Sequence, residues 1–66
     1  MTPQDFALVR RYLRLTQQEL AQELGVSRTT VSRYELVSGR YPIPDGTARL
    51  LKFLVTAKRR EPGDGG

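Results

Sequence analysis

The chain has 66 residues, of which 38% are hydrophobic, so it can form one small domain with a small core. It contains no cysteine and no histidine, which excludes disulfides, thiolate nucleophiles and the usual zinc ligands. Eleven Lys and Arg against seven Asp and Glu give a net charge of +4, which favours a polyanionic partner. With no apolar run that could span a bilayer and no signal-peptide pattern, we expect a cytoplasmic protein without a membrane partner.

The first predicted helix begins after Thr2, which can cap it, with Pro3 at the first helical position and Asp5 in the first turn. Its apolar side is formed by Phe6, Val9 and Leu13. Arg10 lies on the same side of the helix, where its charge is costly to bury without a partner.

A second helix is predicted after Thr16, because Thr16 and Glu19 have the spacing of a capping box. Gly25 can end this helix in a left-handed conformation. The buried side of the helix is predicted to consist of Leu20, Ala21 and Leu24. Ser27 can cap a third helix, in which Val31 and Tyr34 face inward. The opposite face of the third helix gathers four polar residues, Arg28, Thr29, Ser32 and Arg33.

The fourth predicted helix begins at Pro44, and its apolar residues cover a much wider arc than one packed face needs. We expect one side to pack on the other helices and the remainder to form a homodimer interface of Leu50, Phe53 and Ala57. The alternative is a core that wraps around this helix. Residues 59–66 lose the helical periodicity and are predicted to be a disordered tail.

The second and third helices resemble the helix-turn-helix of the Cro and phage-repressor family of DNA-binding proteins. The resemblance extends over about residues 6–54, and the positions that carry it are Ala21, Gly25, Val26, Val31, Tyr34 and Glu35. It implies an all-α, lambda-repressor-like bundle of four or five helices, with the domain at residues 1–58 and the helix-turn-helix at 16–35. It also implies that the third helix docks in the major groove of double-stranded DNA, usually as a homodimer on a partly palindromic operator.

The resemblance further suggests a partner for Arg10. Glu35 lies on the inward side at the end of the third helix, and similar proteins often join the first and third helices by an ion pair at such positions. We therefore predict an Arg10–Glu35 pair, the alternative being that both side chains reach solvent.

The chemistry of the polar face supports base reading. Arginine can donate two hydrogen bonds to guanine, while serine and threonine can bond base edges or touch a thymine methyl. Arg28 and Thr29 should probe deepest, because the N-terminal part of a recognition helix usually contacts the bases. Arg33 can either read a base or hold a phosphate. The predicted base-reading residues are Arg28, Thr29, Ser32 and Arg33.

Phosphate contacts are predicted on both sides of this helix. Gln17 matches a family position that anchors a phosphate at the start of the second helix. The segment after the third helix departs from the commonest family pattern through the intervening Leu36 and Val37. Tyr41 in that segment either contacts the DNA backbone or packs on neighbouring prolines. Arg14 stands where family members frequently have Gly. The predicted phosphate-binding residues are Gln17, Gln18, Ser27, Ser38, Arg40, Tyr41 and Arg14.

These features predict a nucleoid-associated transcriptional regulator of phage or bacterial origin, a Cro-like repressor that occludes a promoter. We expect no enzyme activity, cofactor, metal or small-molecule ligand, since His and Cys are missing, acidic residues are scattered and no glycine-rich phosphate loop is present. Alternatives with the same fold are an antitoxin and a restriction-modification controller. An alternative of another class is a protein-interaction adaptor that has lost DNA contact.

Overall fold

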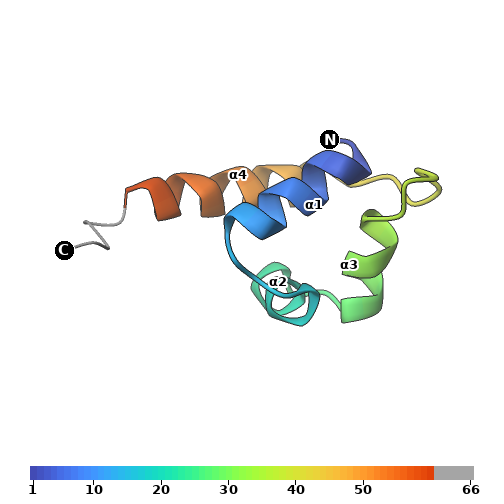
Figure 1. Ribbon diagram of the computed structural model, residues 1–66, viewed down its shortest axis with the longest axis horizontal. Helices are drawn as coiled ribbons and strands as arrows, with labels where there is room; N and C mark the ends of the chain where they lie inside the picture. Colours follow the sequence, from blue (N-terminus) through green and yellow to red (C-terminus); the bar gives the residue numbers. More distant parts are fainter. Residues whose placement is uncertain (61–66) are drawn as a thin grey trace.

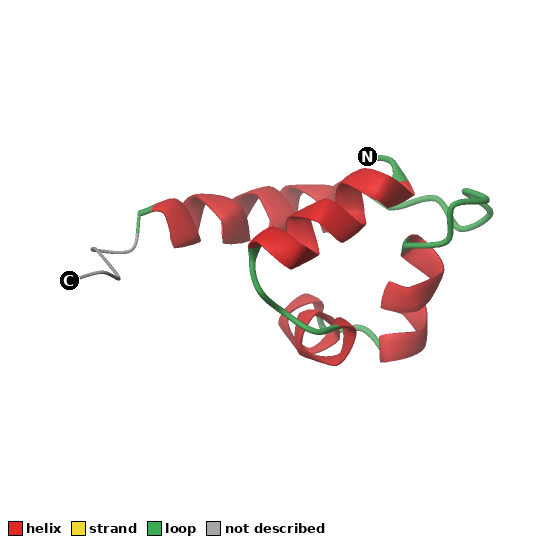
Figure 2. Cartoon of the chain, viewed as in Figure 1, coloured by secondary structure: helices red, strands yellow, loops and turns green. Residues whose placement is uncertain are grey.

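The computed structural model describes residues 1–60, which form four helices and no strand. The helices are α1 (Pro3–Tyr12), α2 (Gln17–Leu24), α3 (Arg28–Tyr34) and α4 (Asp45–Arg59). The predicted all-α fold is confirmed, with four helices rather than five in this part of the chain. Figure 1 shows α1 and the long α4 along one side of the molecule, with α2 and α3 on the other. The longest of the loops in Figure 2 joins α3 to α4.

Side-chain caps determine where the first three helices begin, at the residues that the sequence indicates. Thr2 Oγ1 accepts a hydrogen bond from the backbone N–H of Asp5 at 3.0 Å. Ser27 Oγ accepts one from the backbone N–H three residues further on, at 3.1 Å. Thr16 and Glu19 form both hydrogen bonds of a capping box, at 3.0 and 2.9 Å. These bonds satisfy backbone donors that a helix start leaves unpaired, so each helix begins at a defined residue.

Two connections contain residues in the left-handed region of backbone conformation. Gly25, with φ 73° and ψ 30°, ends α2 as predicted, and α3 can therefore begin three residues later. Arg14, between α1 and α2, has φ 59°, a value that residues with a Cβ atom rarely adopt. The α1–α2 connection is thus built on a strained arginine.

The core takes residues from all four helices. Its fully buried members are Phe6, Leu20, Ala21, Val31 and Leu51. Phe6 of α1 packs edge-to-face on Tyr34 of α3, with ring centroids 5.6 Å apart. Such aromatic pairs add about 0.5–1.5 kcal/mol beyond the area that they bury. Because Val31 and Tyr34 point into this core, the opposite side of α3 is left to solvent.

The end of α4 is attached to the end of α1. Lys58 Nζ donates a hydrogen bond to the carbonyl of Tyr12 at 2.9 Å and lies 5.2 Å from the centre of its ring. Lys58 therefore satisfies a carbonyl that the last turn of α1 leaves unpaired. The helix itself runs to Arg59, one residue beyond the predicted domain boundary, and Arg60 is its C-cap. The predicted disordered tail, from residue 61 onward, lies outside the described residues.

Candidate nucleic-acid interface

The exposed side of α3 carries the residues predicted to read bases. The four side chains on this α3 polar face are Arg28, Thr29, Ser32 and Arg33, and all four are exposed. Since Ser27 caps the helix, Arg28 and Thr29 lie in its first turn. The helix contains no acidic residue, so this surface offers hydrogen-bond donors and positive charge without a competing carboxylate.

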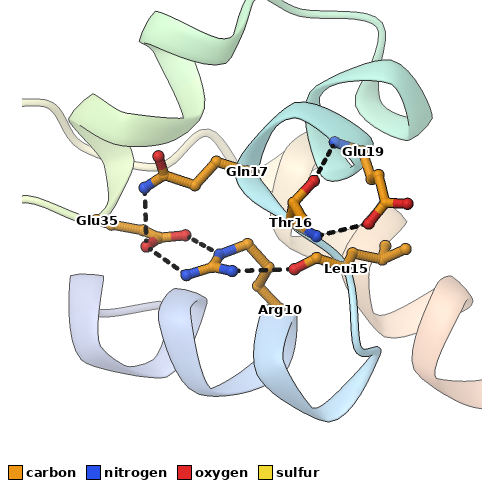
Figure 3. Close-up of polar contacts among 6 residues, drawn as sticks. All are labelled: Arg10, Leu15, Thr16, Gln17, Glu19 and Glu35. Atoms are coloured by element: carbon orange, nitrogen blue, oxygen red, sulfur yellow. Dashed lines mark hydrogen bonds and ion pairs between the residues drawn. The ribbon is translucent and has the colours of Figure 1, made fainter.

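The far end of α3 is held by an ion pair. Arg10 Nε lies 2.6 Å from Glu35 Oε2, and Arg10 Nη2 donates to Glu35 Oε1 at 3.2 Å, so the contact has two hydrogen bonds (Figure 3). The two side chains are only 16% and 11% exposed. The charges that the sequence analysis pairs are therefore in contact, in the two-pronged geometry in which arginine and carboxylate bind most strongly.

Two further residues extend this pair into a network. Arg10 Nη1 donates to the backbone carbonyl of Leu15 at 2.9 Å, and Gln17 Nε2 donates to Glu35 Oε1 at 3.3 Å (Figure 3). The Arg10–Glu35 network, formed by Arg10, Leu15, Gln17 and Glu35, thus joins α1, the α1–α2 connection, the start of α2 and the end of α3. The position of α3 against the rest of the domain is fixed by these bonds.

Sequence reasoning found the ion pair but not these two additional members. The capping box places Gln17 at the first position of α2, yet only the folded chain brings it to Glu35, 18 residues away. The sequence predicts a phosphate contact for Gln17 instead. A side-chain amide carries two N–H groups, so one can donate to Glu35 while the other remains for a DNA phosphate.

The loop between α3 and α4 makes a turn that brings Tyr41 back to α3. The N–H of Gly39, which has φ 68°, donates to the carbonyl of Leu36 at 3.1 Å, and the N–H of Arg40 donates to Ser38 Oγ at 3.3 Å. Beyond this turn the Tyr41 ring lies under the guanidinium of Arg33, whose Cζ atom is 5.1 Å from the ring centre. Two residues predicted to act separately on DNA are therefore in contact with each other.

The remaining predicted phosphate-binding residues do not all lie in one part of the molecule. Gln18 and Arg40 are exposed, and Ser27 is exposed although its hydroxyl is engaged in capping α3. Arg14 lies elsewhere: it lines a hollow with Leu54 and other residues near the C-terminal ends of α1 and α4. Figure 1 shows the α1–α2 connection and the α3–α4 loop at opposite sides of the molecule. The structure therefore does not bring Arg14 together with the loop residues.

Residues 9–36 match the helix-turn-helix family. The comparisons with curated proteins and with solved structures gave no match. Within residues 1–60, no helix has the length and apolar character needed to cross a membrane. The matched span includes the Arg10–Glu35 network and the whole α3 polar face. Residues 9–36 therefore form a helix-turn-helix of the Cro and phage-repressor type, which supports a DNA-binding transcription regulator with double-stranded DNA as its partner.

Proposed function

We propose that this regulator is a Cro-like repressor, which binds a partly palindromic operator as a homodimer and occludes a promoter. The observation that carries the proposal is the α3 polar face: two guanidinium groups and two hydroxyls stand exposed on a helix without acidic residues. Both ends of that helix are fixed, by the Ser27 cap and by Glu35. A reading surface needs this rigidity, because base recognition depends on the placement of a few donors and acceptors.

Roles within the interface follow from position along α3. Arg28 and Thr29 occupy the first turn, the part of a recognition helix that reaches base edges. Gln17 stands at the start of α2, where the helix dipole and the free N–H of its amide favour a phosphate. Arg40 lies exposed in the α3–α4 loop and supplies a positive charge for the DNA backbone.

The proposed dimer surface lies on α4. Phe53 is 65% exposed, Ala57 is exposed and Leu50 is partly buried, so α4 keeps an apolar face outside the core. An aromatic residue of this exposure is a suitable centre for an isologous interface. The proposal includes no catalytic step, since the chain has no histidine or cysteine for one.

The test begins with the selection of bound sites from a random pool of double-stranded DNA. Two related half-sites, centred about 10 base pairs apart or a multiple of that distance, are expected for a two-fold dimer. Arg28→Ala should bind the selected operator about 1–3 kcal/mol more weakly and lose base preference at one position in each half-site. Arg40→Ala should weaken all duplexes alike and reduce the slope of log affinity against log salt by about one unit.

Fluorescence anisotropy over a range of salt concentrations measures both variants, with Gln4→Ala, an exposed change on α1 that is not among the proposed contacts, as the control. If Arg28→Ala kept the affinity and base preference of the parent protein, the assignment of the reading residue would be wrong. If no sequence emerged from selection and binding showed no salt dependence, the protein would be an adaptor rather than a repressor.

A further inference from the structure

Arg33 is the one member of the α3 polar face whose guanidinium contacts another side chain of that interface. It lies in the last turn of α3, with its Cζ atom 5.1 Å from the centre of the Tyr41 ring. A cation over the face of an aromatic ring is attracted by the electron density of that face. The contact therefore selects one orientation among the many that a long, exposed arginine can adopt.

The orientation that this contact gives the Arg33 side chain determines which part of the DNA its guanidinium can reach. Side chains on a helix usually lean toward its N-terminus, which here is the end carrying Arg28. Tyr41 comes after the C-terminal end of α3, in the loop that also carries Ser38 and Arg40. Stacking on Tyr41 thus holds the guanidinium at the loop end of α3, away from the first turn that reads bases.

The contact with Tyr41 leaves Arg33 able to bind DNA. A cation–π contact depends on the charge of the guanidinium and does not use its N–H groups as hydrogen-bond donors. These groups can still bind a phosphate through two parallel hydrogen bonds. Loss of conformational freedom on binding is also smaller for a side chain that is already oriented.

The ring of Tyr41 is suited to act as a support. It is 36% exposed, and Tyr41 lines a hollow together with Thr2, Pro3 and Ile43, which places it near the start of α1. The turn at Gly39 brings it to this place.

We infer that Arg33 binds a phosphate of the DNA backbone rather than a base edge, and that Tyr41 is a positioning residue that orients Arg33 through its ring. This inference rests on the proposed function, because it assigns roles within the same interface. It decides between the two roles that the sequence alone leaves open for Arg33, and it makes the phenol hydroxyl of Tyr41 unnecessary for binding.

The test compares Arg33→Ala, Tyr41→Leu, Tyr41→Phe and the double variant Arg33→Ala/Tyr41→Leu on the selected operator and on a random duplex. Arg33→Ala should weaken both duplexes about tenfold or more, flatten the salt slope by about one unit and leave base preference unchanged. Tyr41→Leu should weaken binding about two- to fivefold, the effect of losing an exposed cation–π contact. Tyr41→Phe should bind as the parent does, since it keeps the ring, and the double variant should be no weaker than Arg33→Ala alone.

Three results would overturn the inference: a change of base preference in Arg33→Ala, equal losses in Tyr41→Phe and Tyr41→Leu, or additive losses in the double variant. Thermal unfolding of each variant confirms that the exposed substitutions leave the domain folded. Arg28→Ala in the same assay separates this inference from the proposed function. If Arg28→Ala loses base preference while the Arg33 and Tyr41 variants behave otherwise than expected, the repressor assignment stands and only the roles of these two residues are wrong.

Discussion

Arg10 engages all three nitrogens of its guanidinium inside the protein. Nε and Nη2 donate to the carboxylate of Glu35, and Nη1 donates to the carbonyl of Leu15. The carboxylate in turn accepts a further bond from Gln17. A charged side chain that lies on the core side of α1 therefore has a hydrogen-bond partner at each of its three nitrogens, which is what makes its partial burial tolerable.

Replacement of either Arg10 or Glu35 alone should lower the free energy of unfolding far more than replacement of both. Arg10→Met or Glu35→Leu leaves the other charge partly buried and unpaired, and each should lower the free energy of unfolding by about 3 kcal/mol or more. Arg10→Met/Glu35→Leu replaces the pair by apolar groups and should be less destabilised than the sum of the single variants. Urea unfolding followed by circular dichroism measures all three. Arg11→Met, which changes an exposed arginine on the same helix, is the control, and small losses that simply add would contradict the coupling.

At the scale of the helices and their connections, the starts and ends follow from local chemistry. Thr2, Thr16, Ser27 and Gly25 each act within one turn of the chain, so the sequence alone predicts them correctly. Arg14 is a local feature of another kind. Its φ of 59° places a residue with a Cβ atom in a conformation that costs about 1–2 kcal/mol.

Arg14→Gly should therefore be more stable than Arg14→Ala by about 1 kcal/mol. This order is the reverse of the usual one, because glycine normally lowers stability by raising the conformational entropy of the unfolded chain. Both variants remove the same side chain, so the comparison isolates the backbone. Chemical denaturation of the two proteins gives the difference. Equal stabilities, or a more stable alanine variant, would show that the α1–α2 connection is not strained.

What could not be predicted depends on contacts between distant parts of the chain. The Arg10–Glu35 pair was inferred from a family resemblance, whereas the part of Gln17 in it depends on how α2 approaches the end of α3. The α3–α4 loop has no helical periodicity, so nothing in its residues alone indicated that a turn at Gly39 would carry Tyr41 onto Arg33. Local signals specify the helices, and tertiary packing specifies which side chains of the interface touch.

At the scale of the whole molecule, two of the apolar surfaces that residues 1–60 leave outside the core involve α4. One is the predicted α4 face, which includes Phe53. The other lies between α1 and α4, in a hollow lined by Leu8 and Val55, and Leu8 is 60% exposed. The sequence does not predict this second surface, because Leu8 lies off the apolar stripe of α1 and its exposure beside α4 depends on how the two helices pack.

Two matched substitutions distinguish these surfaces. Phe53→Glu should raise the dissociation constant of the homodimer by about thirtyfold or more, the effect of losing a central aromatic anchor, and it should weaken operator binding with it. Leu8→Glu places the same charge on the other surface and should leave dimerisation unchanged. Sedimentation equilibrium, without DNA and with it, measures both proteins. Dissociation by Leu8→Glu alone, or a parent protein that stays monomeric even on DNA, would rule out the α4 face as the dimer interface.

The Arg10–Glu35 network also restricts which substitutions at positions 10 and 35 the domain can tolerate in evolution. Lysine at position 10 would offer one compact ammonium in place of a planar fork, and it could not serve both Glu35 oxygens and the Leu15 carbonyl at once. A single exchange that removes the charge at position 10 or 35 leaves the other charge without its partner. The two positions are therefore expected to change together, whereas the exposed Arg28, Thr29 and Ser32 on the α3 polar face can change one at a time.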